Sequence, residues 1–184
     1  DRMNAIGLFR KARTEEPLED YLDGFDEYQG YIEELLETTV DLSRLDMTAL
    51  EVLTDQRLLQ AFRYLAAPPI SADDLKVLAD ATLSKGQLKK RPDDVQRLVQ
   101  VVRSVLDRRR FSWVMDGREP TEAERDAAVM ASAALMAASH AQTRRRVLVK
   151  EQQEAMVKTS LAEIGLKEVP SREIPNVTFA PLAG

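Results

Sequence analysis

The feature that most restricts the fold of this chain is an apolar residue at every third or fourth position along stretches that glycine and proline seldom interrupt. The 184 residues include 7 glycines, and the stretches between them are rich in Ala, Leu, Glu and Arg, which favour helices. A repeat of three to four residues places apolar side chains on one face of an α-helix. The sequence therefore predicts a mainly α protein with few strands.

Local signals divide this pattern into separate helices. An acidic helix with one apolar stripe is expected after Pro17, and Pro68-Pro69 stops a later helix. A hydroxyl residue followed three positions later by an acid marks a helix start, and three such pairs occur: Thr48 with Glu51, Ser71 with Asp74, and Thr121 with Glu124. Pro92 opens another helix, whose expected buried residues are Val95, Leu98, Val99, Val102, Val105 and Leu106.

The second half of the chain changes character. Residues 111–119 are expected to form a loop or short strand, and the Ala-rich residues 127–141 a central buried helix. A further amphipathic helix over residues 147–164 ends at Gly165, and residues 168–174 follow as an extended edge strand. A strand without a partner looks like the beginning of an α/β domain. We therefore expect a helical domain over residues 1–145 and an incomplete second domain over residues 146–184.

Composition restricts the class of protein. Hydrophobic residues make up 44% of the chain and charged residues 31%, which is a globular balance. No apolar run approaches the roughly 20 residues of a membrane span, and the amino terminus lacks the apolar core of a signal peptide. The chain has no cysteine, which excludes disulfides and thiolate metal sites. We expect a soluble cytoplasmic protein without a membrane partner.

Charge is distributed unevenly along the chain, whose formal net charge is -5. Acids dominate residues 14–55, where Arg44 is the single base, and bases dominate residues 85–91, 108–110 and 144–150. An acidic front and a basic middle suit a protein that presents a positive face to a polyanion. Solvated helix faces would give the same pattern, so charge alone leaves both interpretations open.

Two of the basic clusters have companions that favour nucleic-acid contact. Arg108, Arg109 and Arg110 precede Trp113, and a second arginine cluster precedes Lys150. Guanidinium groups bind phosphates bidentately, and an aromatic side chain can insert between bases as a wedge. The alternatives are plain surface charge for the arginines and a core position for Trp113.

Other kinds of site find little support. His140 is the only histidine and has no cysteine to join it, so a zinc or haem site is not expected. Serines lie at caps or on surfaces rather than beside a base, and the glycines form no phosphate-binding loop. Pairs of acids on the first helix are typical of a solvated face. The residues alone therefore contain no complete catalytic site.

Several longer sequence words carry a resemblance to a known family. They are EPLEDYL at residues 16–22, FDEYQ at 25–29, EELLETTVDL at 33–42, AFRYL at 61–65, PPIS at 68–71, DRRRF at 107–111 and GREPTEAER at 117–125. The chain resembles the amino-terminal half of XamI-type restriction endonucleases over most of its length. This resemblance implies a type II enzyme that uses Mg²⁺ and a PD-(D/E)xK core to hydrolyse phosphodiester bonds in double-stranded DNA, acting as a homodimer on a twofold-symmetric target.

The resemblance also implies roles for particular residues. Residues 145–169 look like the first core helix and first strand of the nuclease core, and Glu154 matches a helix glutamate that serves as an auxiliary catalytic or metal ligand. An exposed acid paired with Lys158 is the alternative. The main catalytic residues are expected after residue 184, so this segment alone should be inactive and supply scaffold and DNA contacts. The expected DNA-binding residues are Arg108, Arg109, Arg110, Trp113, Arg118, Arg144, Arg145, Arg146 and Lys150.

A different class of function also fits the sequence. The acidic first half of the chain could bind a basic partner, while the arginine clusters are merely solvated. The alternative hypothesis is therefore a helical protein-interaction or regulatory module without enzymatic activity.

Overall fold

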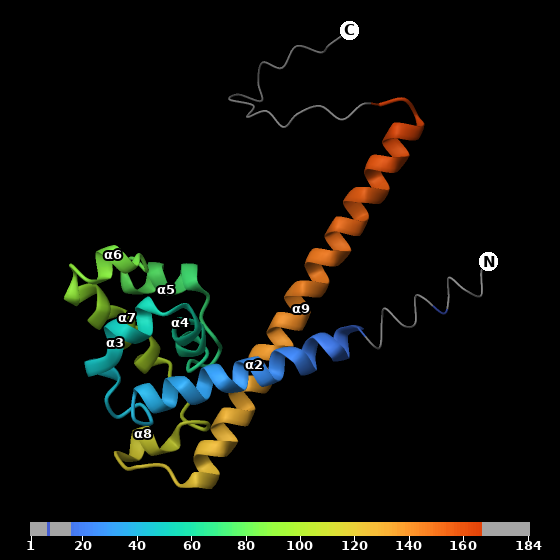
Figure 1. Ribbon diagram of the computed structural model, residues 1–184. Helices are drawn as coiled ribbons and strands as arrows, with labels where there is room; N and C mark the ends of the chain where they lie inside the picture. The colour runs from blue at the N-terminus through green and yellow to red at the C-terminus, as the bar shows by residue number, and fades with distance from the viewer. Residues whose placement is uncertain (1–6, 8–15, 167–184) are drawn as a thin grey trace. The chain divides into compact units, whose positions relative to one another are not determined.

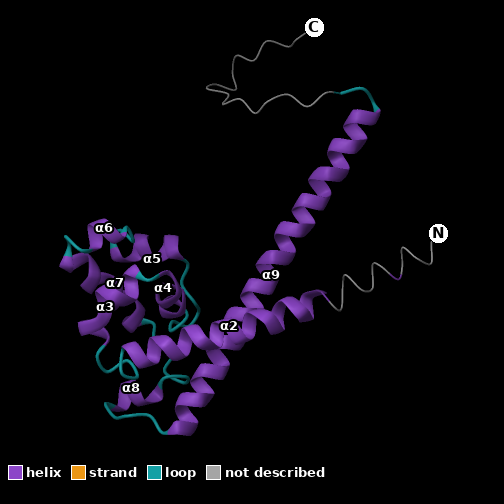
Figure 2. Ribbon diagram, in the orientation of Figure 1, coloured by secondary structure: helices purple, strands orange, loops and turns teal. Residues whose placement is uncertain are grey.

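A computed structural model describes residue 7 and residues 16–166 (Figure 1). This part of the chain consists of α-helices and their connections (Figure 2), which confirms the mainly α prediction for it. The strand predicted at residues 168–174 lies outside the described residues. The chain divides into two compact units, one ending at Thr143 and the other beginning at Arg144. The assignment of the second unit to the start of a nuclease core stays a prediction.

Helix α2 (Glu16–Thr38) is the acidic helix predicted after Pro17, but its apolar stripe is buried only in the second half. Leu18 and Leu22 are 56% and 53% exposed. The buried residues of the stripe are Tyr28, Ile32, Leu35 and Leu36. Burial of these side chains supplies the hydrophobic free energy that holds α2 in the first unit.

Helices α3 (Leu45–Thr54) and α4 (Gln56–Arg63) follow α2. The capping box predicted at Thr48 is wrong, because α3 already begins at Leu45 and the Thr48 hydroxyl donates to the Arg44 carbonyl at 3.2 Å. Asp55 caps α4 instead, since its carboxylate accepts from two backbone N–H groups at the helix start.

Helices α5 (Ala72–Ala79), α6 (Lys85–Leu88) and α7 (Pro92–Ser104) complete the middle of the first unit. Ser71 caps α5 as predicted, because its hydroxyl accepts from the Asp74 backbone N–H at 3.0 Å. The buried face of α7 is the predicted one up to Val102, but Val105 follows the end of the helix and is 40% exposed.

Residues 111–119, predicted as a loop or strand, contain the short helix α8 (Ser112–Asp116). Gly117 ends it with a φ of 63°, a left-handed conformation that glycine adopts at little cost. The segments before α5 and after α7 meet at one isolated antiparallel bridge between Ala66 and Leu106.

Helix α9 (Glu122–Glu163) runs unbroken for 42 residues. The prediction of two helices, at residues 127–141 and 147–164, is wrong, because the arginines between them are good helix formers and neither glycine nor proline intervenes. Before Thr143 the helix has the buried residues Ala128, Val129, Ser132, Ala133, Met136 and Ala137. From Arg144 to Leu166 every residue is exposed. Gly165 follows the helix end, with a φ of 85°.

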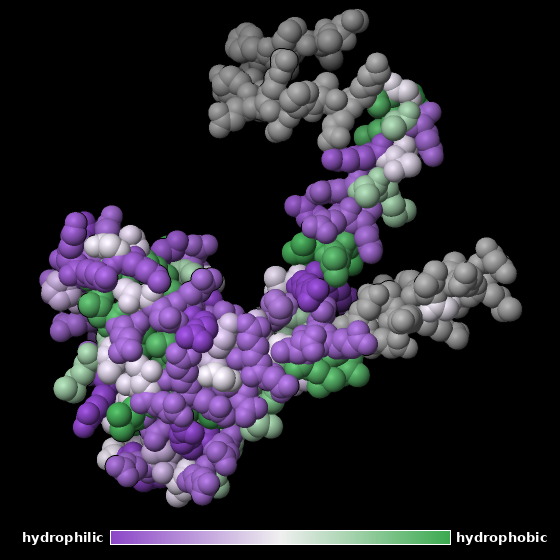
Figure 3. Space-filling model, viewed as in Figure 1, coloured by the Kyte–Doolittle hydropathy of each residue, from purple (hydrophilic) through white to green (hydrophobic). Residues whose placement is uncertain are grey.

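The core of the first unit is built from the buried faces of these helices. Its largest fully buried side chains include Trp113, Phe62 and Phe111. On the face shown in Figure 3 the surface of this unit is mostly hydrophilic, with small apolar patches. Among the described helices, none has both the length and the apolar character that crossing a bilayer requires.

Candidate functional site

The turn at residues 107–110, here called the basic turn, carries the first predicted arginine cluster. Asp107 shapes it, since its carboxylate accepts from the backbone N–H groups of Arg109 at 2.9 Å and Arg110 at 3.2 Å. This is the Asx-type bonding by which aspartate stabilises tight turns. Within this turn, the neighbouring arginines of the cluster lie in different surroundings.

Arg110 is an internal residue of the first unit, with a side chain only 11% exposed. Its Nε donates to Asp107 at 2.8 Å and its Nη1 to the Ser132 hydroxyl at 2.8 Å. Its Nη2 donates to the carbonyls of Tyr64 at 2.8 Å and Ala66 at 3.2 Å. With four N–H groups engaged, Arg110 joins the basic turn to α9 and to the chain after α4. The structure thus gives it a structural role, and its contact with DNA stays a prediction.

The carboxylate of Asp107 responds to these surroundings. Burial raises its pKa, but hydrogen bonds from the Arg110 side chain and from the backbone of Arg110 and Arg109 outweigh burial, so that the pKa lies below its ordinary value of 3.8. Asp107 therefore stays ionised beside Arg110 at neutral pH.

Arg108 and Arg109 are exposed, in contrast to Arg110. No carboxylate within the described ranges forms an ion pair with either side chain. Both guanidinium groups are therefore free to meet an anionic ligand, and their contact with DNA stays a prediction.

Trp113 lies in the core and is 1% exposed. Its indole Nε1 donates to the Asp41 carbonyl at 2.9 Å, and its ring meets Phe111 edge-on, with centroids 5.5 Å apart. Asp41 also accepts from Arg125 Nε at 3.0 Å. These contacts hold a left-handed turn at residues 40–42, which is unfavourable for residues other than glycine. Trp113 therefore takes the core position that was the alternative to a wedge, and its contact with DNA stays a prediction.

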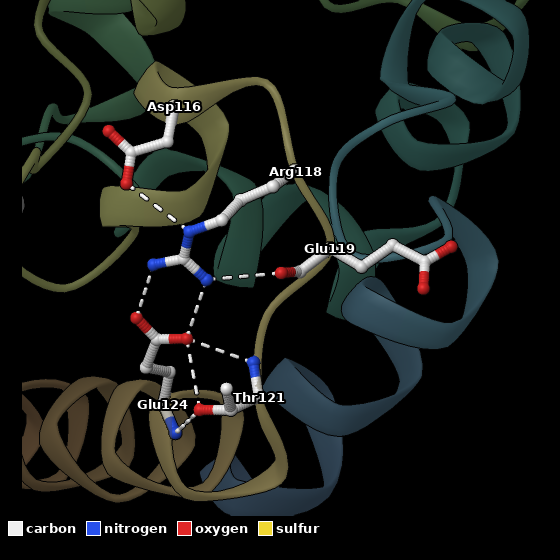
Figure 4. A network of polar contacts seen from close by, with 5 residues as sticks. All are labelled: Asp116, Arg118, Glu119, Thr121 and Glu124. Carbon is white, nitrogen blue, oxygen red and sulfur yellow. Dashed lines mark hydrogen bonds and ion pairs between the residues drawn. The ribbon is translucent and has the colours of Figure 1, made fainter.

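Arg118 is 41% exposed but is already held by acids (Figure 4). Its Nη1 and Nη2 donate to the two carboxylate oxygens of Glu124 at 2.8 and 2.5 Å, and its Nε donates to Asp116 at 3.3 Å. Glu124 also accepts from the Thr121 backbone at 2.9 Å, which confirms the predicted capping box. Hydrogen bonds from Arg118 and Thr121 hold the pKa of Glu124 well below its usual range. To bind a phosphate, Arg118 would have to leave these partners.

The second unit contains the other cluster, residues 144–150, here called the basic stretch. Arg144, Arg145, Arg146 and Lys150 all lie exposed on α9. Within the described part, Arg145 and Arg146 have no carboxylate partner, whereas Lys150 pairs with Glu154 at 3.6 Å. Arg146 and Lys150 share one helix face because they are four residues apart. The basic stretch is helical, whereas the sequence analysis predicted a break between two helices at its start.

Glu154 is exposed on α9, where it forms an ion pair with Lys150 at 3.6 Å. The described residues contain no group of three or more His, Asp or Glu side chains that could hold a metal ion. The auxiliary catalytic or metal role of Glu154 therefore stays a prediction.

The sequence analysis did not identify the distant residues that hold the Arg110 side chain. Ser132 and the carbonyls of Tyr64 and Ala66 are remote from Arg110 in the sequence. The spacing of Asp107 and Arg110 was the available signal, because an acid and an arginine three residues apart often pair.

Comparison with known proteins identifies the family. The family model described as XamI restriction endonuclease matches residues 43–181. The chain is 40% identical over 142 residues to the "Type II restriction enzyme XamI" of Xanthomonas campestris pv. amaranthicola, and this match covers 72% of the chain and 52% of that protein. The chain thus spans about half the length of this curated relative. No solved structure matches the chain. The resemblance seen in the sequence is confirmed, and the chain belongs to the XamI restriction endonuclease family.

Proposed function

We propose that this chain supplies scaffold and DNA contacts to a type II restriction endonuclease that hydrolyses phosphodiester bonds in double-stranded DNA. Its membership of the XamI family supports this function, since the relative that it resembles is a type II restriction enzyme. Because the chain spans about half of that relative, the proposal concerns an enzyme that contains this chain, uses Mg²⁺ and acts as a homodimer.

The observation that carries the DNA-binding part is the pair of exposed arginines in each unit. Arg108 and Arg109 in the basic turn, and Arg145 and Arg146 in the basic stretch, have no carboxylate partner among the described residues. A guanidinium without a protein partner can form two parallel hydrogen bonds with a phosphate. Contacts of this kind fix a protein on a duplex without reading its sequence.

The described residues do not fit a Mg²⁺ site. Mg²⁺ takes oxygen ligands in octahedral geometry, whereas Glu154 is exposed beside Lys150 and belongs to no metal-binding cluster in the described part. We therefore assign no catalytic step to this part of the chain, and we propose that the principal metal ligands belong to other residues of the enzyme.

A gel-shift series with duplex DNA at increasing salt tests the proposal. Each phosphate contact steepens the log-log salt dependence by about 0.9. The double variant Arg108→Gln, Arg109→Gln should therefore bind more weakly at low salt and flatten the slope by about 1.8. The matched control is Lys89→Gln, Lys90→Gln, which removes two adjacent exposed cations from another turn of the same unit.

Two results would contradict the proposal. An affinity of the unmodified chain that does not change with salt would show that phosphate contacts contribute nothing. Equal losses from the arginine and lysine doubles would show an effect of net charge alone. The alternative hypothesis, a protein-interaction module without enzymatic activity, predicts either the first or the second of these two results.

A further inference from the structure

A cavity of about 460 Å³ lies in the first unit between the end of α4, the segment at residues 69–71 and the middle of α9. Arg63 and Tyr64 line it from the α4 side and Ile70 from the connecting segment, while Leu135, Ser139 and Gln142 line it from α9. None of the arginine clusters contributes to it, and the function proposed above leaves it without a role.

Arg63 has unusual surroundings for a half-buried arginine. Arg110 and Arg125, the other half-buried arginines in the described ranges, pair with Asp107 and Asp41. Among the residues that the structure describes, no carboxylate pairs with Arg63, and its Nη1 donates to the Ile70 carbonyl at 3.3 Å. A partly buried charge is costly unless an opposite charge accompanies it. The cavity lining contains no aspartate or glutamate, so an anionic ligand at Arg63 would meet no competing carboxylate there.

The remaining walls suit a ligand that is more than a simple anion. Tyr64 offers an aromatic ring, Ile70 and Leu135 are apolar, and Leu135 is 38% exposed. Ser139 and Gln142 lie three residues apart on α9 and add a hydroxyl and an amide, which can both donate and accept hydrogen bonds. An anionic group attached to a flat, partly polar body has the complementary chemistry.

The wall beside Tyr64 is fixed by the interior of the protein. Arg110 Nη2 donates to the carbonyls of Tyr64 and Ala66, while its Nη1 donates to Ser132 on α9. One side chain that is largely buried therefore joins α9 to the chain after α4, the two elements that form these sides of the cavity. A site held in this way has less conformational freedom to lose when it binds a ligand.

We propose that this cavity binds one nucleotide, with its phosphate at Arg63 and its base or sugar against Tyr64 and Ile70. The nucleotide can belong to duplex DNA, in which case the inference rests on the proposed function, or it can be free in solution. Both sources present the same chemistry, and the experiment separates them.

The first arm measures duplex binding by gel shift with three variants of the 184-residue chain. Arg63→Gln should weaken binding about tenfold, the loss of one charged hydrogen-bond contact, and flatten the salt slope by about 0.9. Ala138→Leu fills the cavity without changing charge and should also weaken binding. Arg57→Gln removes the same charge from α4, where the exposed Arg57 pairs with Glu34 at 3.0 Å, and should change affinity little. Circular dichroism of each variant checks its folding.

The second arm measures thermal unfolding with deoxyadenosine monophosphate or inorganic phosphate at millimolar concentration. A ligand that binds the folded state raises the unfolding temperature. A rise with the nucleotide in the unmodified chain that is lost in Arg63→Gln supports a free-nucleotide source. If Arg63→Gln loses duplex affinity and the free nucleotide does not change the unfolding temperature of the unmodified chain, the bound nucleotide belongs to the DNA.

The inference is overturned if Arg63→Gln and Ala138→Leu behave like Arg57→Gln with both probes. Failure of the proposed function looks different, because then the unmodified chain itself would not bind duplex DNA. If Ala138→Leu does not fold, Arg63→Gln and Arg57→Gln still decide the question.

Discussion

Arg109 and Arg110 are identical neighbours in opposite surroundings. Arg109 is exposed, whereas Arg110 is bound to Asp107, to Ser132 and to two carbonyls near the end of α4. The partners other than Asp107 lie 22 to 46 positions away in the sequence. The two arginines cannot be told apart by composition, because only tertiary packing decides which one is buried.

Replacing Arg110 should therefore destabilise the protein far more than replacing its neighbour. Arg110→Ala leaves Asp107 without its cation and several acceptors without a donor, so the free energy of unfolding should fall by about 3 kcal/mol. Arg109→Ala should change it by less than about 0.5 kcal/mol. Urea denaturation followed by circular dichroism measures both. Similar losses in the two variants would contradict the burial of Arg110.

The lowered pKa of Asp107 predicts a loss of stability in acid. A carboxyl whose pKa is lower in the folded state stabilises the fold above its unfolded pKa, here 3.8, and this contribution disappears as pH falls through the folded pKa. The unmodified chain should therefore lose stability more steeply below about pH 4 than Asp107→Asn, which has no proton to gain. Urea denaturation at several pH values measures the difference, and parallel pH profiles would refute it.

Caps show how far local sequence determines the elements. The predictions at Ser71 and Thr121 are confirmed because the hydroxyl and the backbone N–H that it meets are three residues apart. The same signal at Thr48 misled, since packing of Leu45 and Ala49 into the core extends α3 toward the preceding turn. The continuity of α9 was missed for the opposite reason: the change in apolar pattern predicts a break, whereas the intervening residues themselves favour a helix.

The capping box at the start of α9 should have a measurable effect. Thr121 accepts from the Glu124 backbone N–H at 3.2 Å, so Thr121→Ala should lower the free energy of unfolding by about 1 kcal/mol. Thr143→Ala is the control, because Thr143 lies within α9 and its hydroxyl donates to the Ser139 carbonyl. That substitution should be neutral or slightly stabilising, since alanine favours helices more than threonine does. Thermal unfolding compares the variants, and equal effects would contradict the cap.

For the molecule as a whole, sequence reasoning was most successful where the information is periodic or specific to a family. The repeat of apolar residues predicted the mainly α fold, and the long sequence words identified the family. The candidate site was predicted less well, because a list of basic residues does not distinguish Arg108 in solvent from Arg110 in the core or Arg118 in an acid network. Arg63 escaped notice because only the folded structure shows that no carboxylate of the described residues pairs with it.

The two exposed arginine pairs belong to different units, and their combined effect tests whether both engage one duplex. Each phosphate contact releases counterions independently, so losses from separate contacts add. Replacing Arg108, Arg109, Arg145 and Arg146 together with glutamine should flatten the salt slope by about 3.6, twice the roughly 1.8 expected of either pair alone. Gel shifts at four or more salt concentrations, with the two doubles alongside, measure this sum. A quadruple variant that loses no more than one double would confine DNA contact to a single unit.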